Sequence, residues 1–180
     1  MNGYTRIRRV KVFGARVYIH WSALLVAGAL LALSIRTPLL ALITIGCYLG
    51  IIFVHEAGHA FFAQRLGYRP FAIYLGFVHG RCDYEEPYSR KHEAIVAWGG
   101  VAAQLALAVP LIVLAQTTSV AGVPGLGPVF GFLGYINLVV ALFNLTPVRP
   151  LDGARAWALV PILWSERARK PKPRRKFGRR

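Results

Sequence analysis

The sequence predicts an all-α polytopic membrane protein with about four transmembrane segments, a short broken helix and a small membrane-associated β-hairpin. Three observations support this class. Hydrophobic residues make up 56% of the 180 residues. They are gathered in long runs rather than spread at the period of an amphipathic helix or strand. The formal net charge of +15 comes mostly from basic residues at both ends and between the apolar runs, which favours membrane topology and contact with anionic lipid headgroups.

We expect a basic cytosolic arm over residues 1–16, an intramembrane core over residues 17–165 and a basic cytosolic tail over residues 166–180. This division predicts a multi-pass protein of the cell membrane with both termini in the cytoplasm. So basic a tail is also typical of a segment that binds nucleic acid, but membrane topology already accounts for its charge. The lipid bilayer is therefore an expected partner, and nucleic acid is not.

Four apolar segments account for the predicted crossings, over residues 21–35, 39–64, 94–116 and 129–145. His20 and Trp21 stand where the first segment begins, and amphipathic rings favour the membrane interface. We therefore interpret His20 as an interfacial residue in preference to a metal ligand. With the amino terminus inside, the second segment returns to the cytosol near Arg65, so residues close to its end lie nearer the cytosolic face.

Residues 71–80 are β-prone and are broken at Gly76 and Gly80. We predict a short hairpin that dips into the membrane interface, although these residues alone fit a cytosolic connecting loop equally well. Lipid does not tolerate exposed strand edges, so a hairpin at this depth must pack against protein or receive another strand. His79 and His92 are interpreted as solvated loop residues.

Within the second apolar segment, His55, Glu56 and His59 form an HExxH pattern. Residues four apart share a helix face, so the two histidines can offer nitrogens to one metal ion, with Glu56 beside them as general base and acid. The pattern also arises by chance on solvated helix faces. Here residues 39–53 are almost wholly apolar. A charge at the bilayer centre costs about 2.5–3.5 kcal/mol on insertion scales, which favours a metal site.

The fourth apolar segment breaks down over residues 144–153, which contain two prolines and end in an Asp-Gly pair. An apolar helix resumes over residues 154–164 and is too short to cross alone. Of the seven acidic residues, Glu56 and Asp152 are the two in membrane-associated apolar context. Catalytic zinc needs a third protein ligand beside two histidines, and Asp152 is the candidate. The alternative role for Asp152 is an N-cap of the following helix.

The third apolar segment carries glycines and alanines between residues 99 and 106, a pattern that favours close helix packing. Gln104 is the polar exception in this segment. We interpret Gln104 as a partner in an interhelical hydrogen bond, in preference to a direct substrate contact.

The HExxH pattern and the segment that ends in Leu-Asp-Gly, in this order, resemble the two motifs of the site-2 protease family of intramembrane zinc metalloproteases. The resemblance extends from the first crossing to the helix after Asp152. It implies that His55, His59 and Asp152 bind one zinc ion together with a catalytic water. It also implies that Glu56 is the general base and acid.

The resemblance further implies where substrate binds. Asn144 would position substrate or stabilise the oxyanion, and the hairpin near residues 71–80 would offer an edge to an unwound substrate helix. Gln104 stands where the family commonly has Asn, which makes it a second candidate for substrate or oxyanion contact. Val101 stands where the family commonly has Pro.

The function expected from these residues is hydrolysis of a peptide bond in the transmembrane segment of a partner protein, such as a membrane-tethered regulator, by a zinc metalloendopeptidase. Two alternatives belong to other classes. A catalytically silent membrane scaffold of the same fold would need no zinc. A metal-handling membrane protein should show further polar residues along a path across the bilayer, and the third and fourth segments offer few.

Overall fold

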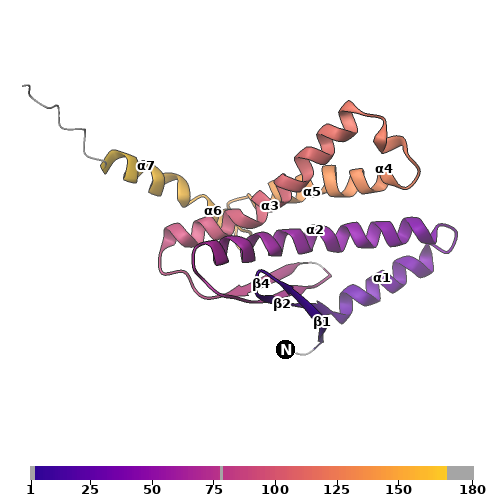
Figure 1. Ribbon diagram of the computed structural model, residues 1–180, viewed down its shortest axis with the longest axis horizontal. Helices are drawn as coiled ribbons and strands as arrows, with labels where there is room; N and C mark the ends of the chain where they lie inside the picture. The colour runs from indigo at the N-terminus through magenta and orange to yellow at the C-terminus, as the bar shows by residue number, and fades with distance from the viewer. Residues whose placement is uncertain (1–2, 78, 170–180) are drawn as a thin grey trace, which may run out of the picture.

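The computed structural model describes residues 3–77 and 79–169 (Figure 1). Helix α2, Pro38–Arg65, lies in the middle of the molecule. Helix α1, Trp21–Leu33, and a small sheet lie on one side of α2, and helix α3, Arg90–Thr117, lies on the other. A further helical run packs on α3 and consists of α4 (Leu126–Val129), the π-helical segment η2 (Phe130–Ile136) and α5 (Asn137–Asn144).

Three helices in the described part of the chain are long and apolar enough to cross a membrane: α2, α3 and the run Leu126–Asn144. They correspond to the second, third and fourth predicted crossings. The first predicted crossing is α1, whose 13 residues extend about 20 Å at 1.5 Å per residue. This length is short of the roughly 20 residues that a span needs. The helices thus fit a multi-pass membrane protein with three crossings of full length.

The predicted hairpin is present as part of a mixed sheet of four strands. Strands β3 and β4 are antiparallel and form that hairpin, which rules out a simple connecting loop. Strand β2 pairs parallel to β3, and β1 pairs antiparallel to β2. Strand β2, which begins at the end of the predicted arm, therefore supplies the strand that the hairpin needs, the arm itself forms β1, and β4 is an outer strand of the sheet. The strands are β1 (Tyr4–Val12), β2 (Ala15–His20), β3 (Pro70–Leu75) and β4 (Gly80–Tyr84).

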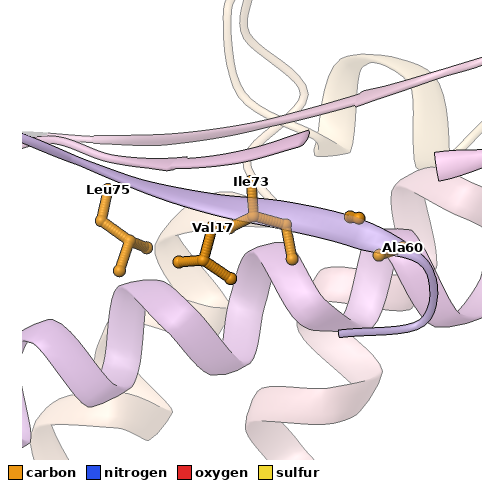
Figure 2. Close-up of a cluster of buried hydrophobic side chains, with 5 residues drawn as sticks. Val17, Ala60, Ile73 and Leu75 are labelled. Carbon is orange, nitrogen blue, oxygen red and sulfur yellow. The ribbon is translucent and has the colours of Figure 1, made fainter. Parts of the chain in front are cut away.

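The sheet packs on α2 through a small apolar core (Figure 2). Val17 from β2 and Ile73 and Leu75 from β3 are buried against Ala60 of α2. Burial of these side chains removes apolar surface from water and fixes the sheet on the helix. Because Ala60 directly follows the HExxH residues, this core also places the sheet next to them.

The break after α5 is followed by turns and by two short helices, α6 (Gly153–Ala156) and α7 (Leu159–Arg169). The sequence predicts one helix over residues 154–164, and this prediction is wrong in detail. Pro161 has no N–H, and its ring would clash with the Trp157 carbonyl in a continuous helix, so the helix is interrupted. The first residues of the predicted tail belong to α7, and residues 170–180 lie outside the described residues.

Candidate metal centre

Two imidazole nitrogens meet on one face of α2. His55 and His59 are about one helical turn apart, and their Nε2 atoms are separated by 3.1 Å. The ring planes are 89° apart. His59 is buried and His55 is partly buried. The spacing of four residues thus brings two nitrogen donors to one point inside the protein.

Asp152 brings a carboxylate oxygen to the same point. Its Oδ2 atom lies 2.9 Å from His55 Nε2 and 3.2 Å from His59 Nε2. Asp152 does occupy the N-cap position of α6, but its side chain makes no capping hydrogen bond. In the part of the chain that the structure describes, these three side chains form a group whose donor atoms could share one metal ion.

This donor set fits a zinc ion. Catalytic zinc takes imidazole nitrogens and carboxylate oxygens, and tetrahedral bonds of about 2.0–2.1 Å place such donors roughly 3.3 Å apart. The three separations here are 2.9, 3.1 and 3.2 Å. Burial raises the pKa of Asp152, but the neighbouring His55 and His59 outweigh that effect and hold the pKa well below its usual range. Asp152 therefore carries an ionised carboxylate near neutral pH.

Helix α3 orients both imidazole rings. His59 Nδ1 donates to the Val96 carbonyl oxygen at 2.8 Å. His55 Nδ1 lies 2.9 Å from Gln104 Oε1. A proton on Nδ1 leaves the lone pair of Nε2 free for a metal. The interhelical hydrogen bond predicted for Gln104 is present, and its partner is a histidine of the HExxH pattern.

Glycines allow α2 and α3 to approach closely. A Cβ atom at Gly58 would lie 2.3 Å from the Gly99 carbonyl oxygen. A Cβ atom at Gly100 would lie 2.6 Å from His59 Nε2 and 2.7 Å from His55 Cε1. The small-residue face of the third predicted crossing is thus where α3 meets the HExxH helix, and Gly100 leaves the space that the two rings occupy.

Two tryptophans that the sequence analysis does not single out hold the broken segment. Trp98 Nε1 donates to the Ala156 carbonyl oxygen at 2.9 Å, and Trp157 Nε1 donates to the Leu145 carbonyl oxygen at 2.6 Å. The two indole rings also contact each other edge to face. A broken helix leaves carbonyls without helical partners, and indole N–H groups can satisfy them. For Trp157, its place just after the predicted helix break is the signal that points to this role, whereas no local signal marks Trp98.

Glu56 lies beside the His55, His59 and Asp152 side chains and against the sheet. Its side chain is buried, at 5% exposure. A Cβ atom at Gly80 would lie 2.4 Å from Glu56 Oε1, so the backbone of β4 contacts the carboxylate. Because β4 is an outer strand, the open edge of the sheet lies close to Glu56.

Two further titratable side chains on β4 are neutral near pH 7. Burial raises the pKa of the Cys82 thiol to about 12, and the charge of Glu56 adds to this effect. Burial also raises the pKa of Tyr84 to about 12. Neither side chain is therefore a negatively charged proton acceptor at neutral pH.

The structure places the remaining candidate residues in different surroundings. Asn144 is the last residue of α5, and its side chain makes no hydrogen bond within the described residues, so its role stays a prediction. His20 caps α1 through its side chain, as suits a residue outside the metal group. His79 is exposed. His92 is a different case, because it lies in the first turn of α3 and contacts the Tyr68 hydroxyl at 2.8 Å, so its prediction as a solvated loop residue is wrong.

No protein-family model matches the chain. A protein of Synechocystis sp. that bears the name of a zinc metalloprotease is 33% identical over 171 residues, covering 88% of this chain and 44% of that protein. Rip3 of Mycobacterium tuberculosis, which bears a similar name, is 29% identical over 163 residues, covering 81% of this chain and 41% of Rip3. The chain thus spans less than half the length of these relatives.

A solved structure shares this fold. The structure of the site-2 protease from Methanocaldococcus jannaschii matches with a TM-score of 0.64 at 21% identity, covering 91% of this chain and 72% of that one. This match shows a shared fold, and the relatives share the zinc metalloprotease name. The chain is thus similar in sequence to proteins named zinc metalloproteases, and it shares the fold of a site-2 protease.

Proposed function

We propose that the protein is an intramembrane zinc metalloprotease that hydrolyses a peptide bond within the transmembrane segment of another membrane protein. The convergence of His55, His59 and Asp152 beside Glu56, among helices able to cross a membrane, carries this proposal. Zinc held by the three ligands would activate a water molecule and polarise the scissile carbonyl. A membrane-tethered regulator is one kind of substrate that fits.

Glu56 is the general base and acid in this proposal. It takes a proton from the attacking water and later gives it to the leaving amine. Its position between the metal ligands and the backbone at Gly80 supports the role, because the base must stand close to both water and substrate. Asn144, at the end of α5, positions the substrate or stabilises the oxyanion.

The substrate reaches Glu56 as an extended strand. Peptide bonds in a helix are shielded by their own hydrogen bonds and side chains, so the substrate must unwind locally. Strand β4 pairs with β3 on one side, and its other edge can accept main-chain hydrogen bonds from an added strand. Gly80 brings this edge against Glu56, which would place the scissile bond beside the base.

The distribution of charge supports a topology with four crossings and both termini in the cytoplasm. Arg65, Arg90 and Arg149 flank one end of the three long helices, whereas residues 118–148 contain no Asp, Glu, Lys or Arg. Helix α1 then supplies the remaining crossing, with local thinning of the bilayer to match its length. Glu56 lies nine residues before Arg65, about 13 Å along the helix, and so nearer the cytosolic face.

The proposal is tested with Glu56→Gln in cells and in the purified protein. The substitution removes the base and retains the three metal ligands, so we expect zinc binding to persist and cleavage to stop. Membrane proteomes of cells carrying each form should show an uncut membrane protein that accumulates with Glu56→Gln alone. Glu166→Gln, an exposed exchange in α7, is the matched control.

The outcomes separate the function classes. Identical membrane proteomes for wild type and Glu56→Gln would contradict a protease. A scaffold would show no zinc in the purified wild type. A metal-handling protein would bind zinc and move it across proteoliposomes with or without Glu56.

A further inference from the structure

Gln104 is fully buried in α3, at 0% exposure, although its side chain is polar. Its Oε1 atom lies 2.9 Å from His55 Nδ1, and the Nε2 atom of the same ring faces Asp152. We infer that Gln104 is a positioning residue that fixes the tautomer and the ring orientation of His55 for metal binding. This inference rests on the metal centre of the proposed function and extends it to a residue outside the ligand set.

The chemistry of imidazole requires such an acceptor. A neutral imidazole carries its proton on one nitrogen only. If Nε2 of His55 offers its lone pair to a metal, the proton sits on Nδ1 and needs a hydrogen-bond acceptor. Gln104 Oε1 fills this role. The reversed amide would set the hydrogens of Gln104 against the Nδ1–H of His55, donor against donor.

His59 meets the same requirement in a different way. Its Nδ1 atom donates to the Val96 carbonyl oxygen, which is backbone and persists whatever side chain stands at that position. Val96 and Gln104 are eight residues apart on α3, about 12 Å along the axis. One helix therefore orients both ligand rings, through its backbone at His59 and through a side chain at His55.

Gln104 is itself held in place by Asn137, which is also fully buried. Asn137 Nδ2 donates to the Gln104 carbonyl oxygen at 3.1 Å and to the Leu133 carbonyl oxygen at 3.2 Å. The first of these bonds ties the start of α5 to the turn of α3 that bears Gln104.

Burial of the Gln104 side chain lowers the stability of the fold, because one of its polar atoms makes no hydrogen bond within the described part of the chain. Among the described residues, its Nε2 atom is buried without a hydrogen-bond partner. A buried donor without a partner is unfavourable, so satisfaction of the side chain does not explain its presence. The contact of Oε1 with His55 does explain it.

Two substitutions separate positioning from packing. Gln104→Met keeps the length of the side chain and removes the acceptor, whereas Gln104→Glu retains an acceptor. Gln64→Met, at an exposed position of α2, is the matched control. For the purified full chain, zinc affinity is measured by competition with a chelator, and thermal unfolding of the metal-free protein is measured in parallel.

We expect zinc affinity to fall about 10–100-fold in Gln104→Met, the range typical of partners that orient metal ligands. Gln104→Glu and Gln64→Met should stay within about threefold of wild type. The metal-free Gln104→Met protein should unfold at no lower temperature than wild type, because the lost hydrogen bond matters to the metal and not to packing.

Wild-type zinc affinity in Gln104→Met would overturn the inference. Equal losses of affinity in the Met and Glu variants, with lower unfolding temperatures for both metal-free proteins, would also overturn it by indicating a packing role. In both cases zinc binding by the wild type leaves the proposed function standing. A wild-type protein that binds no zinc would reject the proposed function and this inference together.

Discussion

The two sides of helix α2 are built differently. On the α3 side, the helix backbones meet at Gly58 and Gly99, and α3 supplies the acceptors that orient both histidines. On the α1 side, an apolar cavity of about 140 Å³ lies between the helices, lined in part by Ala27 and Tyr48. The two histidines thus face the tightly packed side, whereas Glu56 contacts the sheet. The positions of both histidines therefore depend on α3, and we expect α1 to tolerate substitution.

The largest effect is expected from Gly100→Ala on the α3 side. Its new methyl group would lie within 2.8 Å of atoms of both His55 and His59, so the rings must move apart from Asp152. We expect zinc affinity to fall about 100-fold or more, measured by chelator competition. Gly46→Ala on α2 is the control, because a Cβ atom there meets nothing within 4 Å. Wild-type zinc affinity in Gly100→Ala would show that close packing of α3 does not fix the positions of His55 and His59.

A smaller and more selective effect is expected from Gly80→Ala on the sheet. The methyl group would displace Glu56 and leave the metal ligands in place, because its close contacts are with the Glu56 carboxylate. We expect the cleavage rate of a model transmembrane substrate to fall about 100-fold, in the range of general base catalysis, with zinc affinity unchanged. Gly28→Ala in α1, which has open space around it, is the control. Loss of zinc together with activity would contradict the separate placement of base and ligands.

The smallest effect is expected on the α1 side. Ala27→Leu should fill part of the apolar cavity and raise stability by about 0.5–2 kcal/mol, as cavity-filling changes commonly do. Zinc affinity should not change. Thermal unfolding in detergent measures the first effect and chelator competition the second. Gly58→Leu, a similar enlargement on the α3 side, should instead destabilise the protein by roughly 1–3 kcal/mol through overpacking. Equal changes in stability for Ala27→Leu and Gly58→Leu would show that the two sides of α2 are packed equally tightly.

The sequence was sufficient to predict the parts of the molecule that depend on local pattern. Long apolar runs predicted the three long helices, and the spacing of His55 and His59 predicted two donors on one helix face. Asp152 is predicted as the third ligand because zinc needs a third donor and Asp152 is the other acidic residue in apolar context, and the structure brings its carboxylate to both rings. The hairpin followed from β-prone residues broken by glycines.

The rest depends on contacts between distant segments. Pairing of the basic N-terminal strand β2 with β3 joins residues that are more than fifty positions apart, and no local pattern encodes their register. The roles of Trp98 and Trp157 depend on which carbonyls the broken helix leaves free in three dimensions.

The most direct test of the divided metal centre is the zinc content and zinc affinity of the purified full chain, determined by elemental analysis and by chelator competition, with and without Asp152→Ala. Asp83→Ala, which removes the carboxylate paired with Arg81 on β4, is the matched control. We expect one zinc ion per chain in the wild type and in Asp83→Ala, and at least a tenfold loss of affinity in Asp152→Ala, since the substitution removes a ligand. Wild-type zinc affinity in Asp152→Ala would contradict the account and leave Asp152 as a residue of the helix cap.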